Sequence, residues 1–184
     1  NPSDGYGGKA IAICLAEFRA RVYLEPDEVL RILGSRSETG VFSSLIDAHH
    51  HFDRLGCDDG SRLLNAALRR FVLARPELEQ IDPADPRLRF AIRYETDIPR
   101  QVGLAGSSAI VIAALRALAK WFDTSLSTQE LAYLALAAET EDLGIAAGPM
   151  DRIVQAHQGV VVMDLAEPGD VSSYRALAEE CLPP

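Results

Sequence analysis

The sequence has few cysteines, no long apolar run and no excess of basic residues. Its three cysteines, Cys14, Cys57 and Cys181, lie far apart, and no Cys-x-x-Cys pair or Cys/His zinc spacing occurs. This usage favours the reducing cytoplasm over a disulfide-forming compartment. No apolar run reaches the roughly 18 residues of a membrane-spanning helix, so we expect no membrane partner. The formal net charge of -9 argues against a general nucleic-acid-binding protein, whose surface would be basic.

The two ends of the chain also lack familiar features. The first residues, NPSDGYGGKA, resemble neither a signal peptide nor a transit peptide. A domain rarely opens on such a turn-rich segment, and the last residues, AEECLPP, are equally abrupt. We therefore expect the chain to be part of a longer protein. Its 184 residues, 48% of them hydrophobic and 24% charged, suit about one domain with a packed core.

Hydrophobic periodicity predicts a mixture of strands and helices. The apolar and alternating segments 9–18 and 19–25 predict two paired strands, whereas 26–33 predicts a short helix and 34–60 is mixed and polar. Further along, the patterns predict strands at 87–95 and 159–165 and helices at 61–75, 107–122, 127–142 and 151–158. The helix at 127 begins with Ser-Thr-Gln-Glu, which is a capping box.

One segment, IPRQVGLAGSSAIVIAALRAL at 98–118, places flexible residues directly before an apolar helix. Gly103 and Gly106 allow backbone angles closed to other residues and leave room for a ligand. The two serines that follow stand where the helix begins, and the unpaired amides and positive dipole there favour an anion such as phosphate. From Pro99 to Trp121 the sequence has no Asp or Glu, although the chain is acidic. A serine hydroxyl at this position can also reach a phosphate-bound Mg²⁺.

The plain alternative is a turn whose glycines bend the chain and whose serines cap the helix. The segment is not a P-loop, because no Gly-Lys-Ser or Gly-Lys-Thr follows, and the Gly-x-Gly-x-x-Gly order of Rossmann folds is absent. His49, His50 and His51 invite a metal interpretation. Consecutive residues cannot all converge on one ion, so we expect a surface or core role for them.

Three segments resemble the GHMP kinases, a family that includes galactokinase, homoserine kinase and mevalonate kinase. IPRQVGLAGSSAI is similar to the phosphate-binding motif of the family, usually Pro-x-x-x-Gly-Leu-Gly-Ser-Ser-Ala, with Ala105 as one extra residue. NPSDGYGGKAIA and AAETEDLGIAAGPMDRIVQAHQGVVVMD resemble the first motif and the catalytic-aspartate segment of the glucuronokinase branch. The resemblance therefore extends from residue 1 to about 165, with the three motifs in the family's order.

By this resemblance, the turn binds the triphosphate of ATP through Gly103, Leu104, Ala105, Gly106, Ser107, Ser108 and Ala109. Asp151 corresponds to the catalytic carboxylate, and Ser108 and Glu139, after a one-residue gap, correspond to the Mg²⁺ ligands. Glu139 and Glu141 are two residues apart and cannot face the same side of a helix. The first motif places Asn1, Asp4 and Lys9 beside the substrate.

The residues alone leave plainer roles open for these positions. Residues 139–142 fit a solvated acidic helix end, and Asp151 fits the N-cap of the helix that it opens. Asp4 fits an Asx turn, and Lys9 fits a surface position as well as a substrate contact.

The resemblance implies an α+β fold in which a mixed, mostly antiparallel sheet has helices packed on one side. Residues 1–166 would form the ATP-binding N-terminal domain without its first strand. Residues 167–184 would begin a ferredoxin-like C-terminal domain that this chain otherwise lacks.

The implied activity is transfer of the γ-phosphoryl group of ATP to a sugar hydroxyl, with Mg²⁺ as cofactor and glucuronate, which gives glucuronate 1-phosphate, as first choice. Alternatives within the family are kinases for a heptose phosphate, galactose or a mevalonate-type alcohol. From other classes, an inactive relative that binds nucleotide or metabolite as a regulator and a pure interaction domain remain hypotheses. The sequence predicts no oligomeric state.

Overall fold

Two sheets form the framework of the computed structural model, which describes residues 7–34, 38–57, 61–165 and 174–177. The larger sheet has the order β2-β5-β3-β4 and contains β2 (Ala20–Pro26), β5 (Phe90–Thr96), β3 (Leu30–Leu33) and β4 (Glu38–Phe42). Only the β3–β5 pair among these is parallel. The smaller sheet, β1-β6-β7, is antiparallel and contains β1 (Lys9–Ile13), β6 (Val160–Asp164) and β7 (Tyr174–Leu177). The predicted mixed, mostly antiparallel architecture is confirmed.

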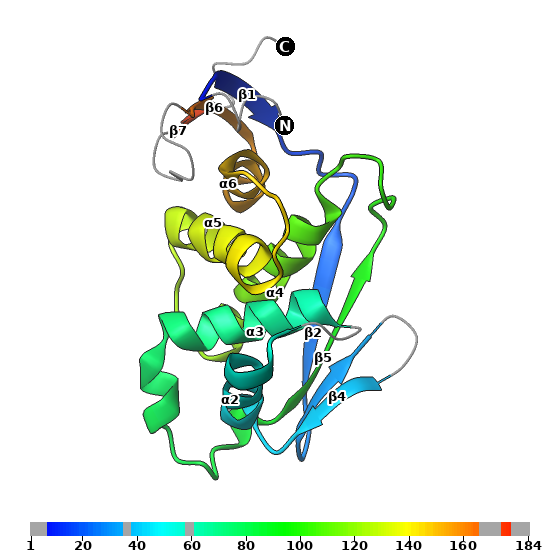
Figure 1. Cartoon of the computed structure of the whole chain (residues 1–184), viewed down its shortest axis with the longest axis vertical. Coiled ribbons are helices and arrows are strands. Elements are labelled where there is room, and N and C mark those ends of the chain that lie inside the picture. The colour runs from blue at the N-terminus through cyan, green and yellow to red at the C-terminus, as the bar shows by residue number, and fades with distance from the viewer. Residues whose placement is uncertain (1–6, 35–37, 58–60, 166–173, 178–184) are drawn as a thin grey trace.

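Helices cover one face of the larger sheet, and the smaller sheet lies beyond α6 (Figure 1). The described α-helices are α2 (Leu45–Leu55), α3 (Arg62–Ala74), α4 (Gly106–Trp121), α5 (Thr128–Ala137) and α6 (Pro149–His157). A π-helical turn, η3 (Ala138–Asp142), continues α5. Two short 3-10 helices, η1 (Pro76–Gln80) and η2 (Pro86–Leu88), lie between α3 and β5.

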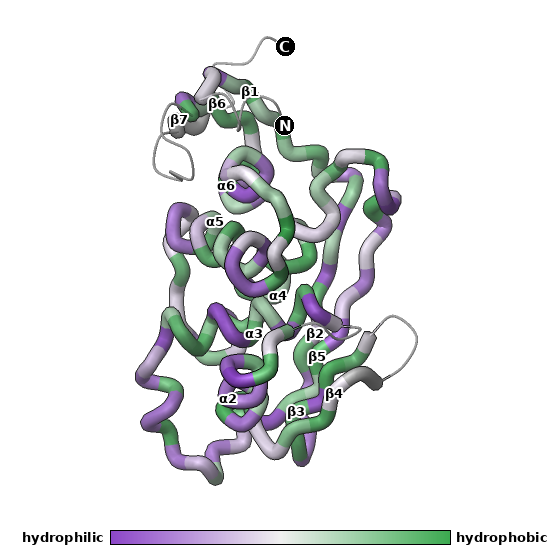
Figure 2. Tube along the Cα trace, in the orientation of Figure 1, coloured by the Kyte–Doolittle hydropathy of each residue, from purple (hydrophilic) through white to green (hydrophobic). Residues whose placement is uncertain are grey.

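Helix α4 lies at the centre of the fold and contacts β2, β5, α3, α5 and α6. It is apolar on nearly all sides, and Val111, Ala114, Leu115 and Leu118 have no exposed surface. Such a helix is stable only when it is buried. Figure 2 shows the same contrast along the chain, with hydrophobic residues along α4 and many hydrophilic ones in the outer connection between α3 and β5. The packing therefore holds the N-terminal end of α4 in a fixed place.

The structure corrects two predictions about the first third of the chain. The segments 9–18 and 19–25 do not pair with each other, because β1 pairs with β6 and β2 pairs with β5. Segment 26–33 contains strand β3 rather than a helix, and its Leu30 and Ile32 alternate in the core with no exposed surface. The first error concerns strand partners that lie far away in the sequence, whereas β3 pairs both with the distant β5 and with the neighbouring β4.

Other local predictions are confirmed. Ser127 caps α5, and its hydroxyl accepts a hydrogen bond from the Glu130 amide at 3.1 Å, as the capping box predicts. The alternating segment 87–95 contains β5, and 159–165 contains β6. Within the described ranges, no helix has both the length and the apolarity to cross a membrane.

Candidate active site

The glycine-serine segment forms a left-handed turn that leads into α4. Gly103 has a φ of 78°, and Ala105, the residue before the helix, has φ and ψ of 51° and 43°. The Ala105 carbonyl accepts the first helical hydrogen bond, from the Ala109 amide at 3.1 Å. Within the described chain, the amides 106–108 have no hydrogen-bond acceptor, and no side chain caps this end. These free amides at the positive end of a buried helix suit an anion.

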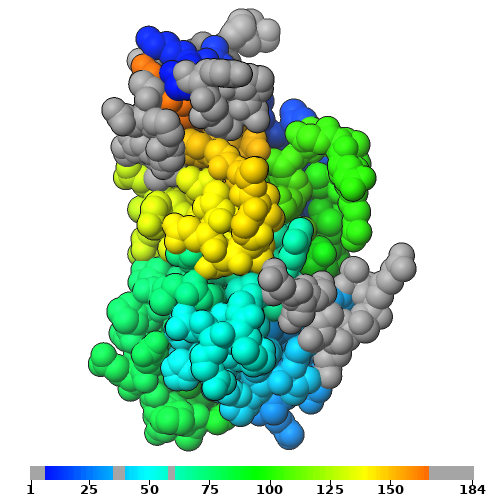
Figure 3. Space-filling view, viewed as in Figure 1, coloured from blue at the N-terminus to red at the C-terminus, as the bar shows by residue number. Residues whose placement is uncertain are grey.

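A cavity of ≈ 520 Å³ lies against this turn. Gly103, Leu104, Ala105 and Ala109 line it on one side, and Asp151 lines it from the first turn of α6. In Figure 3, the green surface of the segment before α4 borders the yellow and orange surface of residues near 150. The structure thus places the predicted phosphate turn and the predicted catalytic acid around one cavity.

Asp151 is partly exposed beside this cavity. Its side chain keeps 41% of its surface exposed, and its Oδ2 lies 3.5 Å from Arg152 Nη1. The N-cap of α6 is Gly148, so the alternative of Asp151 as an N-cap is wrong. The carboxylate lies in the first turn of the helix, where the dipole favours a negative charge.

Glu139 and Ser108, the predicted metal ligands, are both completely buried. Glu139 lies in the π turn η3, and its Oε2 accepts hydrogen bonds from Arg152 Nε at 2.7 Å and from Arg152 Nη2. Among the residues that the structure describes, neither Glu139 Oε1 nor Ser108 Oγ has a hydrogen-bond partner. A carboxylate and a hydroxyl are the hard oxygen donors that Mg²⁺ accepts beside phosphates and water, so this pair fits the ion in chemical type.

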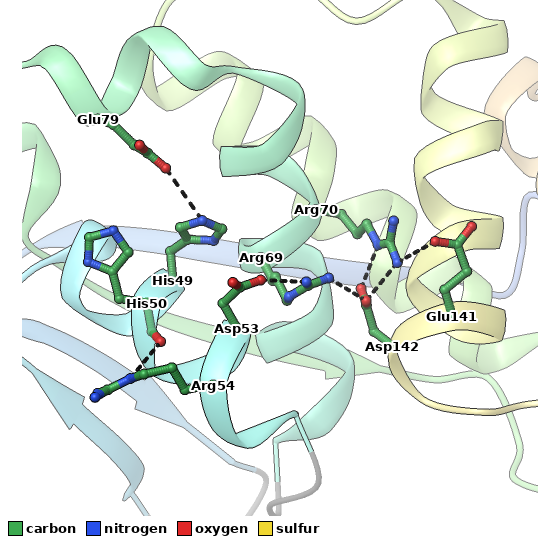
Figure 4. Close-up of polar contacts among 9 residues, drawn as sticks. All are labelled: His49, His50, Asp53, Arg54, Arg69, Arg70, Glu79, Glu141 and Asp142. Carbon is green, nitrogen blue, oxygen red and sulfur yellow. Dashed lines mark hydrogen bonds and ion pairs between the residues drawn. The ribbon is translucent and has the colours of Figure 1, made fainter.

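A solvated acidic helix end at 139–142 is a wrong description. Asp142 is buried and accepts hydrogen bonds from Arg69 Nη1 at 2.7 Å and from Arg70 Nε at 2.6 Å (Figure 4). Glu141 is more exposed and lies 2.8 Å from Arg70 Nη2, on a different side from Glu139. Burial lowers the pKa of Arg70, but the hydrogen bonds and negative charges of Asp142 and Glu141 together outweigh burial and raise the pKa. These contacts fix the π turn against α3.

The π turn sets the directions of the acidic side chains that follow α5. A π turn holds one residue more than an α-helical turn and is frequent at functional sites. The turn lets Glu139 point into the core while Asp142 reaches the arginines of α3.

Sequence reasoning missed three side chains that belong to the surroundings of this site. Arg152 holds Glu139, and Gln155 donates from Nε2 to the Ala105 carbonyl at 3.0 Å. Arg116 lines the cavity and donates to the Ala156 carbonyl at 2.8 Å, at the end of α6. Burial lowers the pKa of Arg116, and the nearby Cys14 opposes that shift. The i, i+4 spacing of Gln155 from Asp151 could have suggested Gln155.

The remaining predicted residues do not line the cavity or fall outside the residues that the structure describes. Asn1 and Asp4 fall outside the described residues. Lys9 is exposed on β1, and its Nζ lies 3.8 Å from Asp164 Oδ2. His49 is buried, with Nε2 3.5 Å from Glu79 Oε1 (Figure 4), and no cluster of three metal-ligating side chains occurs in the described ranges.

Comparisons with known proteins identify the family of the chain. The profile of the family described as GHMP kinases N terminal domain matches residues 63–159. The chain therefore belongs to the GHMP kinase family. It is 38% identical over 170 residues to Glucuronokinase 1 of Arabidopsis thaliana. The aligned region covers 91% of this chain and 46% of that protein. It is 36% identical over 77 residues, 42% of this chain and 23% of the relative, to a D-glycero-alpha-D-manno-heptose 7-phosphate kinase of Campylobacter jejuni.

Solved structures show the same fold at lower identity. A D-glycero-D-manno-heptose 1-phosphate kinase from Bacteriodes thetaiotaomicron aligns with a TM-score of 0.69 and 24% identity, over 88% of this chain and 48% of that chain. The Methanococcus jannaschii mevalonate kinase aligns with a TM-score of 0.70 and 18% identity. This alignment covers 97% of this chain and 51% of the mevalonate kinase chain. The chain spans about half the length of these relatives.

Proposed function

We propose that the protein containing this chain is an ATP-dependent kinase that transfers the γ-phosphoryl group to a sugar hydroxyl. One observation supports the proposal: the turn that leads into α4, through Gly103, Leu104 and Ala105, and Asp151 of α6 line one cavity. Phosphoryl transfer depends mainly on positioning and on charge stabilisation, and both groups are suited to these tasks.

Each part of the site has a separate role in this proposal. The segment Gly103–Ala109 binds the phosphates of ATP, with the free amides of residues 106–108 as hydrogen-bond donors. Asp151 orients the acceptor hydroxyl and accepts its proton. Ser108 and Glu139 hold Mg²⁺, which, when bound, neutralises charge on the phosphate oxygens. Asn1, Asp4 and Lys9 contact the sugar, as the first motif implies.

Glucuronate is the proposed acceptor, with glucuronate 1-phosphate as product. The support is the 38% identity with Glucuronokinase 1 over nearly the whole chain. The shorter match to a heptose 7-phosphate kinase supports a phosphorylated heptose as the second candidate. In this proposal, residues 1–166 form the ATP-binding domain, 167–184 begin the next domain, and the enzyme works in the cytoplasm.

An ATP-consumption screen on the full-length protein tests the proposal. ADP release is measured with glucuronate, galacturonate, glucose, galactose, heptose phosphates and mevalonate, and the product is located by phosphorus NMR. We expect ADP release with glucuronate and a new anomeric phosphate signal. A protein that shows a nucleotide-dependent thermal shift but releases ADP with none of these compounds is a binding regulator, and that result contradicts the proposal.

A further inference from the structure

The ion pair between Glu139 and Arg152 is buried and asymmetric. Their side chains are 0% and 5% exposed, and both Nε and Nη2 of Arg152 donate to the same oxygen, Glu139 Oε2. A guanidinium and a carboxylate commonly pair side by side, with one hydrogen bond to each oxygen. Here Oε1 lacks a partner among the described residues, although buried polar atoms are nearly always paired. The arginine thus holds the carboxylate by one oxygen and leaves the other available.

Arg152 also contacts the start of α6. Its Nη1 donates to the Gly148 carbonyl at 3.0 Å and lies 3.5 Å from Asp151 Oδ2. One planar guanidinium therefore touches Glu139, the residue before α6, and the proposed catalytic acid. Because the guanidinium is rigid, these contacts fix the place of Glu139 relative to the first turn of α6.

We propose that Arg152 is a positioning residue of the phosphotransfer site, which holds Glu139 so that Oε1 is available to a divalent cation. This inference rests on the proposed function, in which Ser108 and Glu139 hold Mg²⁺. Ser108 Oγ, like Gln155 Oε1, is a further buried oxygen without a hydrogen-bond partner in the described chain. Replacement of a side chain that hydrogen-bonds to a metal ligand typically lowers metal affinity or activity about 10- to 100-fold.

A purely structural ion pair would behave differently. Buried ion pairs contribute little net stability, but removal of one partner leaves an uncompensated charge and destabilises the fold. On that view, replacement of Arg152 lowers the melting temperature without a selective effect on Mg²⁺. The two roles therefore differ in the Mg²⁺ dependence of nucleotide binding, which can be measured without turnover.

The test uses the full-length protein with Arg152→Gln and Arg152→Lys. Calorimetry measures binding of a non-hydrolysable ATP analogue in EDTA and over a range of Mg²⁺ concentrations. We expect Arg152→Gln to raise the half-saturating Mg²⁺ concentration about 10- to 100-fold and to leave binding in EDTA unchanged. Arg152→Lys keeps the positive charge but loses the two hydrogen bonds from one rigid group. We therefore expect its half-saturating Mg²⁺ concentration to lie between those of the wild type and Arg152→Gln. If Arg152→Gln does not fold, the half-saturating Mg²⁺ concentration of Arg152→Lys is compared with that of the wild type instead.

Arg75 offers a matched control, because it is also mostly buried and pairs with Glu130 at 2.7 Å, away from the site. Arg75→Gln should lower the melting temperature and leave the half-saturating Mg²⁺ concentration unchanged. Unchanged Mg²⁺ dependence in both Arg152 variants overturns the inference. The readout is independent of the sugar: if the wild type phosphorylates no sugar, the proposed function fails, while the binding data still decide the role of Arg152.

Discussion

The side chain of Gln155 donates from Nε2 to the carbonyl oxygen of Ala105 at 3.0 Å. The same carbonyl accepts the Ala109 amide at 3.1 Å, so one oxygen joins α6 to the turn before α4. Because α6 also carries Asp151, this contact fixes the acid relative to the free amides of the turn. Two features that are about fifty residues apart in the sequence become one site through this bond and the cavity beside it.

Replacement of Gln155 by Met should loosen this connection. Loss of one hydrogen bond should reduce the unfolding free energy by about 1 kcal/mol. We expect turnover to fall more than that stability change alone explains, because the acid and the phosphate turn lose their fixed spacing. Chemical denaturation and steady-state kinetics on the full-length protein measure the two effects. A variant with lower stability but wild-type turnover argues against a positioning role for Gln155.

Ala105 adopts a left-handed backbone conformation, which residues with a Cβ atom rarely adopt. Left-handed backbone costs an ordinary residue about 1–2 kcal/mol, and the extra freedom of unfolded glycine offsets about 0.4–1 kcal/mol. We therefore expect Ala105→Gly to raise the unfolding free energy by up to about 1.6 kcal/mol. Ala105→Val should lower it, because β-branched residues fit this conformation worst. Urea unfolding compares the two, and the opposite order would show that the turn relaxes on substitution.

Asp142 should be essential for the π turn. It is buried between Arg69 and Arg70, so Asp142→Asn leaves two arginines undercompensated and should cost about 3–5 kcal/mol. Glu141 is the matched control, since its side chain is 57% exposed and pairs with the same Arg70. Glu141→Gln should cost no more than about 1 kcal/mol. Equal effects of the two substitutions on urea unfolding would contradict the buried network.

The sequence predicted the features of this site that depend on local chemistry. Glycines and serines indicated the turn before α4, and Ser127 and Glu130 indicated the start of α5. Features that depend on long-range packing were not predictable. The partner of β1 lies about 150 residues away, and the burial of Glu139 arises only when η3 and α6 meet. Family resemblance indicated Asp151, but nothing in the residues alone indicated what Arg152 contacts.

His49 should make stability depend on pH in the near-neutral range. The net shift of its pKa is downward, and burial is the largest cause. The positive charges of His50 and Arg69 lower the pKa further, whereas the carboxylates of Glu79 and Asp53 raise it. The unfolded state, with a pKa of about 6.5, then binds more protons, so the unfolding free energy falls as the pH drops below about 6.5.

The slope from this one histidine is at most about 1.4 kcal/mol per pH unit. Urea unfolding between pH 7 and 5 measures it, with His49→Gln as the variant that should flatten the profile. His50→Gln, at an exposed position in the same helix, is the control and should keep the wild-type slope. An unchanged slope in His49→Gln would assign the pH dependence to other groups.

The most direct test of the account is a comparison of Asp151→Asn with the wild type in the full-length protein. Calorimetry measures binding of the ATP analogue with Mg²⁺, and coupled ADP release measures turnover with glucuronate. We predict nearly unchanged analogue binding and a turnover at least about 100-fold lower, as expected for a lost acid-base group. Turnover close to that of the wild type would remove Asp151 from the mechanism and contradict the account.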